Sequence, residues 1–289
     1  MGPQGQPSTT DGNTDSTVVE FTPGGHVVRQ WDLHGKCDGI TADAQLGVLI
    51  ADVNEDANSS VYWIRPGAPK GAQITHFHYN HSPLPQNGGT DAISIYHGLV
   101  LISASAPGTV TGSKPAPQPT YPAVYRVTFK PAKHLAVVKA LFYDEAAAKV
   151  ANVGSTLGKT VNLAITDPDS NEIVPASAPR FAGDFMLTSQ GDQEQIFVSP
   201  HGKLYLANTG GGTIDVITGP FRPGSVLVAV TPCDQNDAPA TCPGPGFPPN
   251  YLGQLNPWTG QITAVNVSGP TFGPQGMVFI GPGWSVVPG

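Results

Sequence analysis

Two four-residue segments with the same pattern constrain the predicted fold more strongly than any other feature of the sequence. Cys37-Asp38-Gly39-Ile40 and Thr90-Asp91-Ala92-Ile93 lie 53 residues apart (37 to 90), and each joins an Asp to a small residue and an Ile. Each of the two is followed by short stretches rich in β-branched residues, with turn residues between them. A unit of about fifty residues made of four strands is typical of one blade of a β-propeller.

The rest of the chain favours the same class. Gly (35 residues) and Pro (30 residues) together exceed a fifth of the 289 residues and disfavour long helices, because Pro breaks the helical hydrogen-bond ladder and Gly loosens the backbone. One helical turn is predicted, at 144–150. Short strands are predicted in nearly every other apolar run, as far as 276–280.

We therefore predict an all-β fold, a single β-propeller of six blades, with five and seven as alternatives. The hairpin at 17–33 lacks an inner strand and the strand at 276–280 lacks partners, so we expect N- and C-terminal strands to close one blade. Residues 1–15 are predicted to be a polar lead-in and residues 16–289 the propeller domain. A β-sandwich is the main alternative, but about twenty strands are too many for one sandwich.

Charge and cysteine usage bear on partners and compartment. The net charge is −7 and no Lys/Arg cluster is present, which argues against nucleic acid and anionic membranes as partners. No apolar run is long enough for membrane insertion. Cys233 and Cys242 flank a short loop, and we predict a disulfide between them, which favours a secreted or periplasmic protein over a cytosolic one. Cys37 is left over and is predicted to be partly or wholly buried.

One part of the sequence resembles the inner-strand repeat of the gluconolactonase/regucalcin, NHL-repeat and virginiamycin B lyase propellers. It consists of the segment 37–40, Asp43 and the predicted strand at 48–52. The resemblance covers most of the chain as a blade pattern. It implies a divalent cation at the mouth of the central channel and comparable positions for Asp38, Asp91 and Asp184. The candidate residues for this mouth are Asp38, Asp91, Arg180, Asp184, Asp192 and Gln275.

Two acidic segments are candidate cation loops. Asn54, Glu55 and Asp56 begin a loop rich in oxygen ligands that follows a strand, and Ca²⁺ binds six to eight such oxygens. The alternative is an Asx-rich turn whose side chains bind their own backbone. The segment 167–172 is similar, and we interpret it as a plain turn.

Histidines and one mixed polar segment complete the candidates. His76 and His78 share one face of a predicted strand and could both reach one Zn²⁺ or Cu²⁺ ion, with His81 from the turn. The alternative is an outer strand with exposed polar residues beside buried aromatic ones.

Arg180 could form a structural bridge with Asp184 or Asp192, or these residues could line a polar pocket.

Three functions remain open from the sequence. The first is an extracytoplasmic propeller that binds a small molecule, glycan or protein partner at the channel mouth, with Ca²⁺ as a candidate ion. The second is a divalent-metal-dependent lactonase or lyase, in which the ion polarises a carbonyl and a channel Asp is the general base. The third is a structural or assembly protein. No nucleotide or flavin motif is present.

Overall fold

The computed structural model is built almost entirely of β-strands. It describes residues 16–22, 24–53, 59–81, 84, 89–105, 107, 121–152, 154–174, 176, 178–189, 192, 194–208, 214–215, 226–230, 251–256 and 258–265. Within these ranges the only helical segments are two short 3₁₀ turns, η2 (Pro131–Lys133) and η3 (Gly154–Thr156). No described segment forms a helix long and apolar enough to cross a bilayer.

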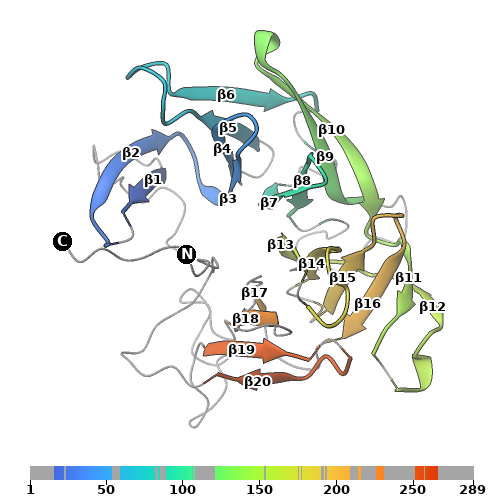
Figure 1. Ribbon diagram of the computed structural model, residues 1–289. Coiled ribbons are helices and arrows are strands. Elements are labelled where there is room, and N and C mark those ends of the chain that lie inside the picture. Colours follow the sequence, from blue (N-terminus) through green and yellow to red (C-terminus); the bar gives the residue numbers. More distant parts are fainter. Residues whose placement is uncertain are drawn as a thin grey trace, which may run out of the picture.

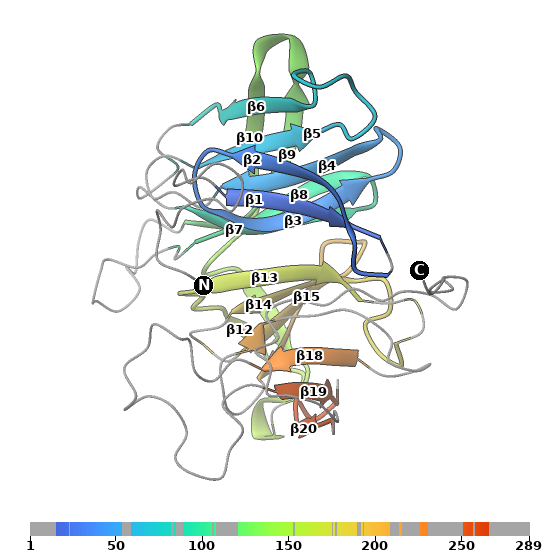
Figure 2. The same ribbon diagram turned by 90° about the vertical axis from the view of Figure 1, so that its left-hand side faces the viewer.

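The strands stand in sheets around one axis, which is the arrangement of a β-propeller (Figure 1). Strands β3, β7, β13 and β17 lie nearest the axis and their sheets extend outward. Figure 2 shows the ring from the side, with β1 to β10 in one half and β13 to β20 in the other. The predicted fold class is therefore confirmed.

The first two units have four antiparallel strands each. The first contains β3 (Cys37–Asp43), β4 (Val48–Val53), β5 (Ser60–Ile64) and β6 (Ile74–Tyr79). The second contains β7 (Thr90–Tyr96), β8 (Leu99–Ala104), β9 (Pro122–Lys130) and β10 (Leu135–Tyr143). Their outermost strands, β6 and β10, meet in a short parallel pairing that joins the two units into one sheet.

The third unit carries an extra hairpin. Its four strands are β13 (Pro168–Ile173), β14 (Phe185–Ser189), β15 (Glu194–Val198) and β16 (Leu204–Asn208). The hairpin of β11 (Ala147–Val150) and β12 (Thr160–Asn162) pairs with the outer edge of β16. The helical turn predicted at 144–150 is wrong, because this segment enters a strand whose alternate side chains are buried.

A fourth sheet and a separate hairpin complete the described strands. The sheet contains β17 (Ile214–Asp215), β18 (Val226–Val230), β19 (Tyr251–Leu255) and β20 (Ile262–Ala264). The hairpin pairs β1 (Ser16–Phe21) with β2 (Val27–Leu33). The strand expected at 276–280 lies outside the described residues, so the closure of the ring and a count of six blades stay predictions.

Apolar side chains fill the space between neighbouring units. On β8, Val100 and Ile102 pack into the core shared with the first unit, whereas Leu101 packs into the core shared with the third. Alternate residues of a strand point to opposite faces, so a sheet packed on both sides is buried on both. Burial of each such side chain contributes about 1.5–3 kcal/mol.

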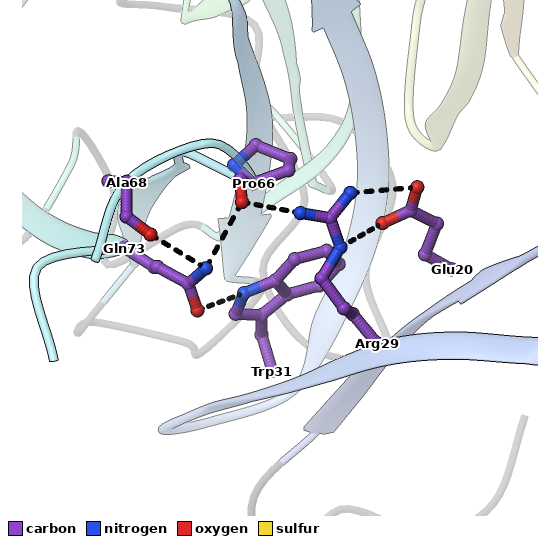
Figure 3. Close-up of polar contacts among 6 residues, drawn as sticks. All are labelled: Glu20, Arg29, Trp31, Pro66, Ala68 and Gln73. Carbon is purple, nitrogen blue, oxygen red and sulfur yellow. Dashed lines mark hydrogen bonds and ion pairs between the residues drawn. The ribbon is translucent and has the colours of Figure 1, made fainter. Parts of the chain in front are cut away.

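Polar contacts attach the β1–β2 hairpin to the first unit (Figure 3). Arg29 forms an exposed ion pair with Glu20 at 2.8 Å, and its guanidinium also donates to the carbonyl of Pro66. The indole N–H of Trp31 donates to the side-chain oxygen of Gln73 at 3.0 Å, and the Gln73 amide donates to the same Pro66 carbonyl. Because Trp31 is buried, its hydrogen bond contributes more to the attachment of the β1–β2 hairpin than the exposed ion pair does.

Candidate site at the start of the inner strands

Each of the first three inner strands begins with a β-bulge that contains an Asp. In β3, Asp38 and Gly39 lie opposite a single residue of β4, since Cys37 pairs with Val53 and Ile40 with Ala51. In β7 and β13 the register shifts in the same way. The bulge pairs are Asp38-Gly39, Asp91-Ala92 and Asp169-Ser170. We call the face of the ring at which these strands begin the start face.

The residue opposite each bulge is polar and buried: Asp52, Ser103 and Thr188. A bulge takes a backbone N–H out of the ladder, so a buried bulge needs another acceptor. Asp52 Oδ1 accepts from the Gly39 N–H at 2.8 Å, and Ser103 Oγ accepts from the Ala92 N–H at 2.9 Å. Thr188 Oγ1 has no hydrogen-bond partner among the described residues.

Direct contacts bring the three bulges together. Ser103 Oγ donates to the carbonyl of Asp169 at 2.8 Å, which joins the second unit to β13. The Asn171 side chain donates to the carbonyl of Ala92 at 2.7 Å. A Cβ built on Gly39 would lie 2.8 Å from the carbonyl oxygen of Asp91, so β3 and β7 run very close at this point. The three bulge Asp residues therefore gather at one end of the axis.

The charge at this end is mainly negative, with one lysine beside it. Lys36 Nζ lies 3.0 Å from Asp38 Oδ2, and this pair is largely buried, with side-chain exposures of 23% and 9%. Burial and then the charges of Asp38 and Asp167 hold the pKa of the Asp91 carboxyl well above 3.8, although Lys36 lowers it. The pKa of Lys36 is raised, because Asp38, Asp91 and Asp169 together outweigh its own desolvation.

Asp52 lies fully buried behind this group. Its burial, and after that the charges of Asp38 and Asp91, hold the pKa of its carboxyl well above 3.8, while the Gly39 N–H bond opposes the shift. No described residue forms a hydrogen bond with Asp52 Oδ2. The start face therefore combines a charged Asp–Lys pair with two carboxyls that hold their protons to higher pH, a set that can bind polar ligands and exchange protons.

The other predicted mouth residues of the third unit lie elsewhere or have structural partners. Asp184 is not comparable to Asp38 and Asp91, because it precedes β14 and its backbone pairs with Val174, at the far end of β13 from Asp169. Burial raises the pKa of the Asp184 carboxyl. Asp192 is on the start-face side, where its oxygens accept from Thr166, at 2.7 Å from the backbone N–H and 2.8 Å from the hydroxyl.

Arg180 lies beside the hairpin of the third unit. Its guanidinium donates to the carbonyl of Ala151 at 3.1 Å and lies 4.5 Å from the ring centre of Phe181. Phe181 in turn stacks on Phe197 at 4.0 Å. These contacts connect Arg180 to the β11–β12 side of the unit.

His76 and His78 lie on one face of β6, as predicted, and their ring centres are 4.4 Å apart. Phe77 and Tyr79 on the other face are buried. Across the described part of the chain no three His, Cys, Asp or Glu side chains form a group that could hold a metal ion. The predicted set of His76, His78 and His81 is thus not found as a three-ligand group.

Several predicted site residues lie outside the described residues: Asn54, Glu55, Asp56, Gln275, Cys233 and Cys242. The calcium loop and the disulfide therefore stay predictions.

Cys37 is a free, partly buried cysteine on β3, in agreement with its predicted place, and burial raises the pKa of its thiol.

Asp169, Lys36 and Asp52 were not predicted as residues of the channel mouth. Asp169 lies in a segment interpreted as a turn, which the structure shows to be the inner strand β13, and this interpretation is wrong. The signal was present, since Pro168-Asp169-Ser170-Asn171 repeats the order of an Asp followed by a small residue. Asp52 could have been found as a lone acid within the apolar run of β4.

Comparisons with known proteins show what the chain is similar to. No protein-family model and no curated protein matches. Among solved structures, virginiamycin B lyase from Staphylococcus aureus is 16% identical with a TM-score of 0.42, and the match covers 83% of this chain and 58% of that one.

Two further structures match in the same range. A protein assigned as a gluconolactonase is 13% identical, with a TM-score of 0.46 and coverages of 88% and 72%. A streptogramin B lyase is 13% identical, with a TM-score of 0.40 and coverages of 84% and 72%. The chain thus spans little more than half the length of the first of these lyases. At such identities and TM-scores, any argument about function rests on the chain's own geometry.

Proposed function

We propose that this protein binds a small polar organic cation at the start face. One observation carries the proposal: Asp38, Asp91 and Asp169 come from three successive inner strands and face a single lysine. Because side chains and backbone contacts hold all three bulges in place, this group is preorganised, which reduces the entropic cost of binding.

The buried carboxyl of Asp52 supports the same proposal. Its Oδ2 atom lacks a hydrogen-bond partner among the described residues, and its pKa is raised partly by Asp38 and Asp91. A cation bound beside these acids would favour their charged forms and would lower their pKa values. Ligand binding should therefore release protons, and it should strengthen as the pH rises.

Calorimetry of the full chain tests this proposal, with spermidine as the probe. We expect binding with an affinity that increases from pH 5 to pH 8 and falls about tenfold or more in Asp38→Asn. Asp32→Asn is the matched control, because it removes a carboxylate of β2 that accepts from the Thr17 hydroxyl and keeps an acceptor oxygen there. Equal affinity in wild type and Asp38→Asn would refute the proposal.

A lactonase or lyase activity is the second candidate. The observation in its favour is Glu194, whose pKa is raised to about 7 by burial and by the charge of Asp192. Glu194 pairs with Ser189, which pairs with Pro168 at the start of β13, so this carboxyl lies two strands from the bulge of Asp169. A group with a pKa near 7 is suited to general base catalysis.

Hydrolysis of an aldonolactone, followed with and without EDTA, tests this activity. A metal-dependent enzyme should lose turnover with EDTA, and Glu194→Gln should remove the limb of the pH profile near 7. Turnover that is indistinguishable from buffer across several lactones would dismiss the candidate.

We further propose an extracytoplasmic location, since the predicted Cys233–Cys242 disulfide requires an oxidising compartment. Intact mass measured before and after reduction, with alkylation in denaturant, would show one bridge and one free cysteine. Three alkylated cysteines in unreduced, natively exported protein would contradict the proposal.

A structural or assembly role remains the third candidate, for which light scattering should show a defined oligomer.

A further inference from the structure

A pair of histidines lies on the outermost strand of the first unit, away from the start face. His76 is half-buried and His78 is exposed on the same face of β6. The ring of His76 stacks on Tyr62 of β5, with ring centres 4.4 Å apart and planes at 12°. Because this stack fixes one imidazole and solvent reaches the other, the pair combines a rigid and an adjustable group.

The spacing of the two rings fits a chelated metal ion. A Zn²⁺ or Cu²⁺ ion lies about 2.0–2.1 Å from an imidazole nitrogen, hence about 3.2 Å from the ring centre. Two imidazoles at about 90° around one ion then have ring centres about 4.5 Å apart, close to the observed 4.4 Å between His76 and His78. The planes cross at 61°, which two cis ligands tolerate because each nitrogen lone pair points along its own ring plane.

His76 also has a nitrogen that lacks a partner. Its Nε2 atom is buried, and none of the described residues forms a hydrogen bond with it. An ion bound at this nitrogen would supply the partner that the described residues do not.

We propose that His76 and His78 form a two-imidazole site for a late first-row divalent ion, Cu²⁺ ahead of Ni²⁺ and Zn²⁺. Imidazole nitrogen suits these ions, and Cu²⁺ binds most strongly in the series. Cis coordination at about 90° matches the square-planar preference of Cu²⁺. His134 supports the strand from behind, since its Nδ1–H donates to the carbonyl of His76 at 3.2 Å.

Titration of the full chain with CuCl₂, followed by calorimetry and electron paramagnetic resonance, tests the site. Wild type should bind one Cu²⁺ ion above any weak background, with a spectrum typical of equatorial nitrogen ligands. His78→Ala and His76→Phe should each lower the affinity on the order of tenfold or more, because each leaves a single imidazole. His76→Phe keeps a ring to stack on Tyr62, so loss of the stack would not explain the result.

His201→Asn is the control, because His201 is exposed in the third unit. It should leave the Cu²⁺ affinity and stoichiometry unchanged. Circular dichroism and thermal melts should show that every variant is folded. An unchanged affinity in the double variant His76→Phe/His78→Ala, or an equal loss in His201→Asn, would overturn the proposal.

Discussion

Among the glycines that the structure describes, Gly39 is the one at which an added methyl group should be least tolerated. A Cβ placed there would lie 2.5 Å from Asp52 Oδ1, 2.8 Å from the carbonyl oxygen of Asp91 and 2.8 Å from the backbone N of Ile93. Two of these three neighbours are backbone atoms of the adjacent inner strand, which cannot turn away as a flexible side chain can. Gly39→Ala should therefore push β3 away from β7 and from Asp52.

The expected cost follows from two effects. Overpacking a closely packed site costs about 1–3 kcal/mol. Displacing Asp52 would also weaken its 2.8 Å bond from the Gly39 N–H, and a buried donor without an acceptor costs about 1–3 kcal/mol. Since the two effects share one displacement, we expect a total of about 3 kcal/mol. In a chain of 289 residues, with an unfolding entropy of about 2.1 cal/mol/K per residue, that corresponds to a Tm lower by about 5 °C.

Thermal and urea unfolding of Gly39→Ala and of the control Gly67→Ala measure this cost. A Cβ at Gly67 would meet no atom within 4 Å, so the control should differ from wild type by less than about 0.5 kcal/mol. The double variant Gly39→Ala/Asp52→Ser should recover part of the loss, because it removes one clash and leaves the two backbone clashes. Equal melting of Gly39→Ala and Gly67→Ala would refute the close approach of β3 and β7.

Three further predictions concern buried polar groups. The raised pKa of Asp52 makes the free energy of unfolding fall as pH rises above about 4, by up to about 1.4 kcal/mol per pH unit until the folded-state pKa is reached. Asp52→Asn should therefore reduce the slope measured by urea unfolding from pH 4 to 8, and the raised pKa values of Asp91 and Glu194 should maintain the rest of it. An unchanged slope would contradict the shift at Asp52. Ser103→Ala should lower the free energy of unfolding by about 1–3 kcal/mol in the same assay, because it removes the acceptor of the Ala92 N–H. Thr188→Val should be neutral or stabilising, because the hydroxyl that it removes has no partner among the described residues. The reverse order of the two variants would be evidence against the bulge contacts. Trp31→Phe should lose about 1 kcal/mol through its bond to Gln73, which an unaltered Tm would disprove.

The sequence predicts the units better than it predicts their spacing. Strands with β-branched residues between turns, such as β4 and β8, are recognisable because their side chains are buried on both faces. A period of 53 residues leads from Cys37 to Thr90, but Pro168 follows Thr90 by 78 residues (90 to 168) because the β11–β12 hairpin lies between the units. A constant period therefore cannot locate β13.

The candidate site depends on features that a linear pattern shows only in part. A bulge adds one residue to a strand, and the added residue resembles any other small residue in the sequence. The ion pair of Lys36 with Asp38 is local and could be expected, since the two residues lie only two positions apart in the sequence. The contact of Asn171 with Ala92 joins residues 79 positions apart, and only the folded ring brings them together.

The first two bulges satisfy their backbone N–H groups with acceptor side chains of different size. Ala92 carries a methyl group and faces the short hydroxyl of Ser103, whereas Gly39 carries none and faces the longer carboxyl of Asp52. In both cases the polar side chain reaches the bulge N–H at hydrogen-bond distance, so the space left by the missing methyl is occupied by the larger acceptor. A hydroxyl would satisfy the backbone equally well and would carry no cost of burying a carboxyl. Stability therefore does not account for the acid at position 52, and its coupling to Asp38 and Asp91 is the property that a serine could not supply.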